Sequence, residues 1–350
     1  MKMKFFSLAM ASALCWQFAC GQTVDSKVVE DGGSGPYKAF VASERALADY
    51  AIYRPQDLKG TVEKVGKLPV IVYGNGGCRN SSVEFEKFLS EIASHGYVIV
   101  AIGPLSRKSV EETNSVMGGM TTADLLNKAI DLITEQANKA GSEYYNMLDL
   151  EHIAAMGQSC GGLQALTASV DSRVKTTLVL NSGIFKSGGM AMPDLSKINM
   201  DSLVATLPDA IKDMLLDENG KMKDLSELMP TGGMAGGMTD GNGLGGSMGK
   251  DGLKQLHAPI VYIIGGPDDI AFENATDDYQ LINHLPVAIA NLPVGHLGTY
   301  QDVHGGQFSV IAMKWLDWQL KGKSGESAFF LDKDYVAKNY PEWSVEHKNF

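Results

Sequence analysis

The chain has 350 residues, of which 44% are hydrophobic and 20% are charged, and its formal net charge is −11. A chain of this length can bury a large core, and its composition is not that of a fibrous or disordered protein. Nucleic-acid binding needs a concentrated basic surface, whereas lysine and arginine are scattered here, so nucleic acid is not expected as a partner.

The first 21 residues have the features of a secretory signal peptide. A basic start, Met1-Lys2-Met3-Lys4, precedes an apolar run that is too short to span a membrane. We expect cleavage between Ala19 and Gln22, which would make the mature protein periplasmic or extracellular with no membrane span. Cys20 leaves a lipid anchor open as the alternative, although the residues before it match a lipoprotein signal poorly.

Residues 22–36 are rich in glycine and polar residues, and we predict a flexible lead-in there. From residue 37 to residue 350 we predict one α/β domain that begins with an edge hairpin over 37–53. Continuous apolar runs then indicate strands buried on both faces, as in a parallel sheet. These runs cover 68–73, 97–102, 153–156, 174–180, 259–264 and 287–292. Apolar residues at helical spacing between the runs predict helices on both faces of a mostly parallel sheet.

Residues 184–257 interrupt this alternation of strands and helices. They contain an amphipathic stretch, 203–216, and a tract rich in methionine and glycine, 232–249. We predict an inserted lid between the sixth and seventh core strands, with the tract as a mobile loop. Dense methionines can also bind metal, but the tract has no histidine and no regular methionine spacing, so soft apolar contacts are the favoured interpretation.

The segment Gly157-Gln158-Ser159-Cys160-Gly161 lies between a predicted strand and a predicted helix. Gly-x-Ser-x-Gly in this context predicts a nucleophile elbow, in which the serine occupies a strained turn and glycines avoid a collision. The same turn would direct the backbone N–H of Cys160 at a developing oxyanion. The alternative is an ordinary glycine-rich turn.

A second glycine-rich turn, Gly74-Asn75-Gly76-Gly77-Cys78, follows the strand predicted over 68–73. Active-site residues of parallel α/β sheets lie at the carboxyl ends of the strands, so we assign the second oxyanion donor to Gly76 or Asn75. A phosphate-binding loop fits the glycine spacing poorly, and a plain turn is the other alternative.

If Cys15 and Cys20 leave with the signal peptide, Cys78 and Cys160 remain, either as a disulfide or as two buried thiols.

The acid and the base of a triad are expected at two later strand ends. Gly-x-x-Asp spacing after the strand predicted over 259–264 favours Asp269 over its neighbour Asp268, which could instead cap the next helix. His296 lies in Gly295-His-Leu-Gly after the last strand and is the expected general base. His304, in a polar loop further along, is the rival.

In combination these motifs resemble the α/β-hydrolase superfamily, and most of all its secreted dienelactone-hydrolase and cutinase-like branch, which includes polyester hydrolases. The resemblance covers residues 37–318. It implies an α/β-hydrolase fold, Ser159 as nucleophile, His296 as base and Asp269 as acid, with Cys160 and the Asn75–Gly76 turn as oxyanion donors. Gln158 and Cys160 depart from the His and Met usual in cutinase-like enzymes, and the long insertion has no counterpart there.

We therefore expect a secreted serine hydrolase that cleaves carboxylic esters, small or polymeric, without a cofactor or a metal ion. A peptidase or amidase would use the same triad but usually carries an added gating domain. A dienelactone hydrolase would prefer a cysteine nucleophile. A non-catalytic binding module on a hydrolase scaffold would normally have lost a triad member, and metal handling by the methionine-rich tract is an alternative of another class.

Overall fold

The computed structural model describes residues 23–105, 121–185 and 246–350. The expected signal peptide, 1–21, with the possible lipid anchor at Cys20, lies outside the described residues. So do the amphipathic stretch 203–216 and the methionine- and glycine-rich tract up to residue 245. Within the described residues, no helix is both long enough and apolar enough to cross a bilayer.

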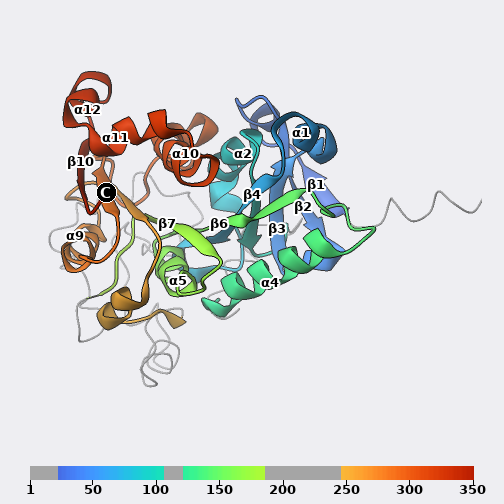
Figure 1. Cartoon of the computed structure of the whole chain (residues 1–350), viewed down its shortest axis with the longest axis horizontal. Helices are drawn as coiled ribbons and strands as arrows, with labels where there is room; N and C mark the ends of the chain where they lie inside the picture. The colour runs from blue at the N-terminus through green and yellow to red at the C-terminus, as the bar shows by residue number, and fades with distance from the viewer. Residues whose placement is uncertain (1–22, 106–120, 186–245) are drawn as a thin grey trace, which may run out of the picture.

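Ten strands of the described chain form one sheet in the order β1-β2-β3-β5-β4-β6-β7-β8-β9-β10 (Figure 1). They are β1 (Thr23–Lys27), β2 (Ala39–Glu44), β3 (Tyr50–Pro55), β4 (Leu68–Gly74), β5 (Val98–Ile102), β6 (Leu148–Gln158), β7 (Val174–Leu180), β8 (Ile260–Ile264), β9 (Val287–Asn291) and β10 (Ser344–Lys348). The strands from β5 to β9 run parallel, whereas β1, β2, β3 and β10 pair antiparallel at the two edges. The mostly parallel α/β sheet expected from the sequence is confirmed.

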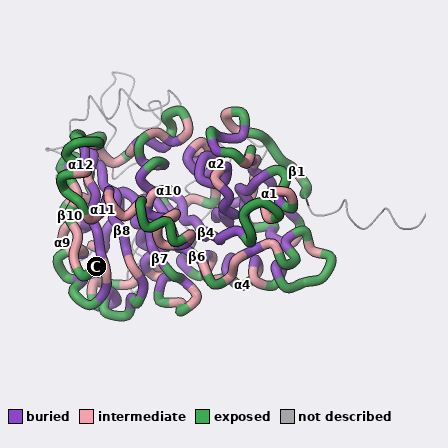
Figure 2. Tube along the Cα trace, turned by 45° about the horizontal axis from the view of Figure 1, so that its top comes forward, coloured by how far each residue is buried: buried purple, intermediate pink, exposed green. Residues whose placement is uncertain are grey.

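The central strands are buried on both faces (Figure 2). In β4, Ile71 and Tyr73 face one core cluster while Val70 and Val72 face another. Because successive side chains of a strand point to opposite faces, a strand covered on both sides needs an unbroken apolar run. That requirement explains why β4, β5, β7, β8 and β9 could be placed from the sequence.

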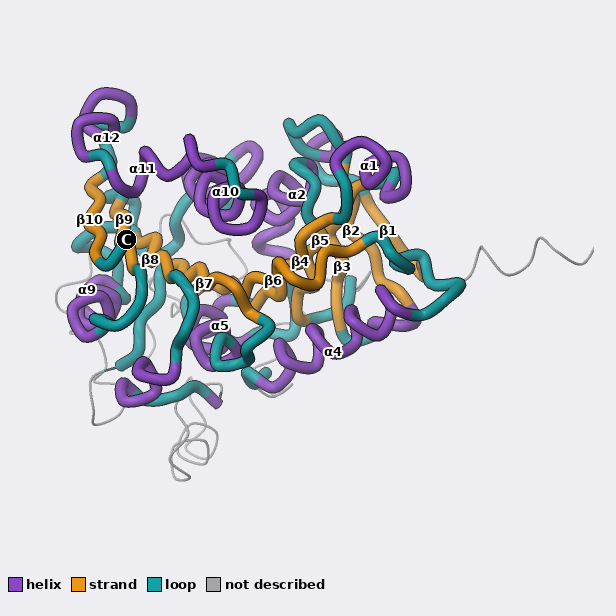
Figure 3. Tube along the Cα trace, in the orientation of Figure 1, coloured by secondary structure: helices purple, strands orange, loops and turns teal. Residues whose placement is uncertain are grey.

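Helices cover both faces of the sheet (Figure 3). The helices α2 (Glu86–Ser94) and α10 (Gly306–Lys321) pack on one face, and α4 (Asp124–Asn138), α5 (Cys160–Ala168) and α9 (Phe272–Leu281) pack on the other. The remaining α-helices are α1 (Leu58–Val65), α11 (Ala328–Leu331) and α12 (Lys333–Asn339). The short 3-10 helices are η1 (Glu30–Gly32), η2 (Arg45–Leu47), η3 (Gly76–Cys78), η4 (Val83–Phe85), η8 (Lys250–Gln255), η9 (Val303–Gly305) and η10 (Ser324–Ser327).

The prediction of a flexible lead-in over 22–36 is wrong, because this segment contains β1 and η1. β1 pairs antiparallel with β2 and extends the sheet by one edge strand. Its side chains are mostly exposed, so it lacks the apolar run by which the other strands were found.

The sequence predicted the insertion between the sixth and seventh core strands. With β1 added to the count, the insertion follows the seventh strand along the chain, β7, and precedes the eighth, β8.

Candidate active site

Ser159 lies at the tight turn between β6 and α5, with φ 53° and ψ −120°. This backbone conformation is rare for an L-residue and is the strained geometry expected of a nucleophile elbow. The Ser159 N–H donates to the Leu180 carbonyl at 2.9 Å, and its own carbonyl accepts from the Ser182 hydroxyl at 2.6 Å. A Cβ at Gly157 would overlap the Gly161 backbone across the turn, and a Cβ at Gly161 would overlap the Gly74 backbone at the end of β4, so both positions need glycine.

His296 and Asp269 complete a chain of hydrogen bonds to Ser159. The His296 Nε2 lies 3.0 Å from Ser159 Oγ, and its Nδ1 lies 2.7 Å from Asp269 Oδ1. The Asp269 side chain is fully buried, while His296 is partly exposed, so the imidazole lies between a buried anion and the open side of the site. Asp268, the neighbouring carboxylate, is exposed and makes no such bond, so Asp269 is the one of the two that reaches His296.

The Asp269 carboxylate accepts four hydrogen bonds. Oδ1 accepts from His296 and from the Ala271 N–H at 2.9 Å, and Oδ2 accepts from the Gly265 N–H at 2.9 Å and from Asn181 Nδ2 at 2.6 Å. Burial raises the pKa of Asp269, but the hydrogen bonds and the nearby imidazole outweigh it and bring the pKa below its usual range. The carboxylate therefore remains ionised, as an acceptor for the imidazole N–H.

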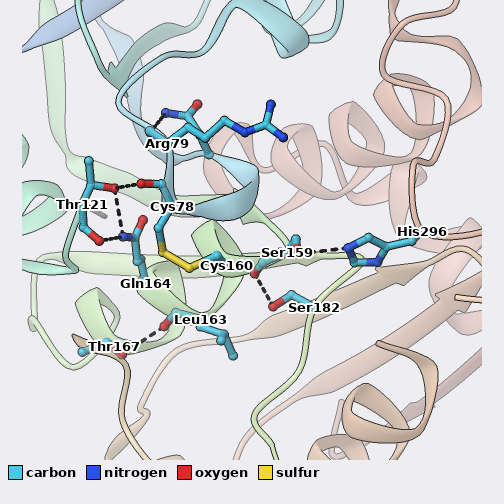
Figure 4. Close-up of a disulfide and its surroundings, with 11 residues drawn as sticks. Cys78, Arg79, Thr121, Ser159, Cys160, Leu163, Gln164, Thr167, Ser182 and His296 are labelled. Atoms are coloured by element: carbon cyan, nitrogen blue, oxygen red, sulfur yellow. Dashed lines mark hydrogen bonds between the residues drawn. A yellow bond between two sulfur atoms is a disulfide. The ribbon is translucent and has the colours of Figure 1, made fainter. Parts of the chain in front are cut away.

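Cys78 and Cys160 form a disulfide with their Cα atoms 5.2 Å apart (Figure 4). Of the two states that the sequence left open for these cysteines, the structure has the disulfide. It connects the glycine-rich turn after β4 to the residue that follows the nucleophile. Cys160 is also the first residue of α5, where backbone N–H groups have no acceptor within the helix. Its N–H is therefore free to donate to a group above Ser159.

The turn after β4 presents Gly76 rather than the Asn75 side chain to the site. Both N–H bonds of the buried Asn75 amide are used, to the Arg79 carbonyl at 2.9 Å and the Ile102 carbonyl at 2.7 Å. Gly76 begins the 3-10 turn η3, and a Cβ there would overlap the Gln158 side chain next to Ser159. Gly76 therefore lies against the Gln158 side chain, which would have to move to admit a larger residue at position 76.

The rival histidine, His304, lies elsewhere. Its Nδ1 is 3.3 Å from Glu91 Oε2 and 3.5 Å from Glu30 Oε2, in contact with α2 and the N-terminal segment. His304 therefore has carboxylate partners of its own and is not the histidine that reaches Ser159.

Three side chains for which the sequence predicts no role bond to the triad directly or through a neighbour. Asn181 donates to Asp269, Tyr300 donates to Asn181, and Gln158 Nε2 donates to the His296 carbonyl at 3.2 Å. Asn181 follows β7 and Tyr300 follows β9, and only the fold brings them together. In the described part of the chain, no group of three or more His, Cys, Asp or Glu residues is arranged to hold a metal ion.

A scan of the sequence against protein-family models finds no match, and a search of the curated proteins finds no significant similarity. The interpretation of the site therefore depends on its geometry.

Proposed function

We propose that this protein is an exported serine hydrolase of the α/β-hydrolase type that cleaves carboxylic esters. The observation that carries the proposal is the hydrogen-bonded chain from Ser159 through His296 to the buried Asp269, built on a strained strand-to-helix turn. The three residues follow in the order Ser, Asp, His, which is the order of the α/β-hydrolase triad.

In the proposed reaction, Ser159 Oγ attacks the ester carbonyl carbon while His296 Nε2 takes the hydroxyl proton. Asp269 keeps the proton of the imidazole on Nδ1 and stabilises the positive charge that forms on the ring. The protonated His296 then delivers its proton to the departing alcohol oxygen, which leaves an acyl group on Ser159. Water repeats the sequence on the acyl-enzyme, releases the acid and restores the serine.

The oxyanion of each tetrahedral intermediate would accept hydrogen bonds from the N–H groups of Cys160 and Gly76. Each donor of this kind contributes about 3 kcal/mol to transition-state stabilisation in well-studied hydrolases. The disulfide between Cys78 and Cys160 supports this assignment because it fixes the distance between the two donor segments. A structural disulfide is also typical of exported proteins, which agrees with the expected signal peptide.

A series of p-nitrophenyl esters from two to twelve acyl carbons tests the proposal. We expect hydrolysis by the purified mature chain and its loss in both Ser159→Ala and His296→Ala, with the thermal midpoints unchanged. The dependence of the rate on chain length would describe the acyl pocket. Faster cleavage of matched p-nitroanilides than of the esters would favour an amidase instead, and equal activity in the wild type and Ser159→Ala would exclude the proposed nucleophile.

A further inference from the structure

We propose that Asn181 and Tyr300 are positioning residues that fix the Asp269 carboxylate in the orientation required by His296. This inference rests on the proposed hydrolase function and extends the triad to five side chains. Neither residue touches the reacting atoms, since Asn181 donates a hydrogen bond to Asp269 and Tyr300 donates one to Asn181.

Asn181 directly follows β7, next to the strand that carries the nucleophile. It is fully buried and has φ 43°, a left-handed conformation that asparagine tolerates better than most residues. Its Nδ2 donates to Asp269 Oδ2 at 2.6 Å and to the Gly295 carbonyl at 3.3 Å. One amide group therefore contacts both the acid and the residue that precedes His296.

Tyr300 fixes which way the Asn181 amide faces. Its hydroxyl donates to Asn181 Oδ1, and its ring packs edge-on against Phe85, Phe88 and Phe308 with centroids 5.2 to 5.3 Å away. Burial raises the pKa of Tyr300 well above its ordinary value, so the phenol keeps the proton that it donates. The three aromatic contacts leave the ring little freedom to direct this hydroxyl elsewhere.

An amide can present either its oxygen or its nitrogen to a neighbour, and here only one choice is favourable. An ionised carboxylate can only accept hydrogen bonds, so the Asn181 oxygen would repel Asp269 if the amide were reversed. The hydrogen bond from the Tyr300 hydroxyl to Asn181 Oδ1 would be lost in that reversal and therefore opposes it. With Asn181, Gly265 and Ala271 donating to the carboxylate, its remaining acceptor position faces His296.

Tyr300→Phe removes the hydroxyl and keeps the packed ring. We expect kcat for the esters to fall about tenfold with KM unchanged, because the substrate does not contact this residue. Without the Tyr300 hydroxyl, the Asn181 amide is no longer fixed and donates less well to Asp269. The acidic limb of the pH–rate profile should then move to higher pH, since a carboxylate with a weaker donor retains the proton on His296 more strongly. Tyr73→Phe is the matched control, because Tyr73 is buried in the same aromatic cluster and its hydroxyl has no hydrogen-bond partner among the described residues.

Asn181→Asp keeps the shape and the backbone preference but replaces the donor with a second carboxyl group. Two ionised carboxylates in contact repel each other, so kcat at neutral pH should be about a hundredfold below the wild-type value, and this deficit relative to the wild type should narrow as the pH is lowered. At a residue with only a structural role, the ratio of variant to wild-type kcat would not change with pH. Asn146→Asp is the control, an exposed asparagine that also has positive φ, 59°.

The outcomes separate this inference from the proposed function. If the wild type hydrolyses esters but Tyr300→Phe and Asn181→Asp match it in kcat and in pH profile, the positioning role is excluded and the hydrolase stands. If the wild type neither hydrolyses esters nor reacts with a fluorophosphonate, the proposed function fails and the inference fails with it. A drop in kcat confined to these two variants, with a shifted acidic limb and unchanged controls, supports the inference.

Discussion

Ser159 has a strained backbone, and the bonds around it show how the chain maintains that strain. A backbone conformation of this kind costs about 1–3 kcal/mol and persists only where interactions with neighbouring groups hold it in place. Here the Ser159 N–H and carbonyl are both bonded to the end of β7, through Leu180 and Ser182. The elbow is therefore stabilised by the adjacent strand as well as by its own glycines.

Asp269→Asn should separate the role of the buried acid from that of its exposed neighbour. The amide cannot accept from His296 as the carboxylate does, and we expect kcat for ester hydrolysis to fall about 1,000-fold or more with a much smaller change in KM. Asp268→Asn, one residue away and exposed, is the control and should keep wild-type rates. Equal losses in the two variants would contradict the assignment of Asp269.

The triad could be predicted from the sequence because each member lies in a short local motif at a predicted strand end. Asn181 and Tyr300 could not, because their roles depend on partners 88 and 119 residues away along the chain. The sequence around an asparagine at a strand end does not show whether its side chain binds a carboxylate or belongs to an ordinary turn. Only the packing of β7 beside β8 reveals which it is.

At the scale of elements, the disulfide links the turn after β4 to the start of α5 across a sequence separation of 82 residues. Cys78→Ser/Cys160→Ser should lower the free energy of unfolding by about 2–4 kcal/mol, because the unfolded chain gains freedom when the cross-link is removed. It should also slow ester hydrolysis, since the two proposed oxyanion donors are no longer linked. Denaturant unfolding and kcat measure the two effects.

A reductant supplies the control for the disulfide. Dithiothreitol should reproduce both losses in the wild type and leave the double serine variant unaffected. If the double variant unfolds at the wild-type denaturant concentration and keeps the wild-type kcat, the disulfide neither stabilises the chain nor organises the site.

Glu91 on α2 connects the N-terminal segment to the helix layer. Its buried carboxylate accepts from the Ser34 hydroxyl at 2.5 Å and N–H at 2.7 Å and pairs with His95 at 3.0 Å. Burial raises the pKa of Glu91, but the hydrogen bonds from His95 and Ser34 outweigh it and lower the pKa from 4.5 to about 2. A carboxyl group with a lowered pKa stabilises the fold above its ordinary pKa, and this stabilisation is lost as the pH falls from 4.5 towards 2.

Glu91→Gln should therefore be less stable than the wild type at pH 7, by about 2 kcal/mol, and the difference should shrink between pH 4.5 and pH 2. Urea unfolding across this pH range measures it. Glu63→Gln, on the exposed surface of α1, is the control and should follow the wild type. A difference that stays constant with pH would show that the Glu91 carboxylate charge is not the source of the stability.

Elements with a strong apolar pattern were predicted, and elements without one were missed. The parallel strands β4, β5, β7, β8 and β9 lie within a residue or two of the predicted runs. The edge strands β1 and β10 read Thr-Val-Asp-Ser-Lys and Ser-Val-Glu-His-Lys, with mostly exposed or half-exposed side chains. Such strands form because a neighbouring strand offers backbone partners, and no local property of the sequence reveals that neighbour.

For the whole molecule, the parallel arrangement explains how distant segments build one site. The Gly76 turn, Ser159, Asn181, Asp269 and His296 each follow the carboxyl end of a different parallel strand: β4, β6, β7, β8 and β9. Because the carboxyl ends of parallel strands share one edge of the sheet, these residues meet there. In the sheet, the strands that precede Asp269 and His296 lie on the β7 side of the elbow strand β6, and the strand that precedes the Gly76 turn lies on its other side.

Reaction with a fluorophosphonate, followed by intact mass and peptide mapping, is the most direct measurement of the central claim that Ser159 is an activated nucleophile. We predict one covalent adduct per chain, located on Ser159, formed much more slowly in His296→Ala and absent in Ser159→Ala. No adduct in the folded wild type, or an adduct that persists in Ser159→Ala, would contradict the account.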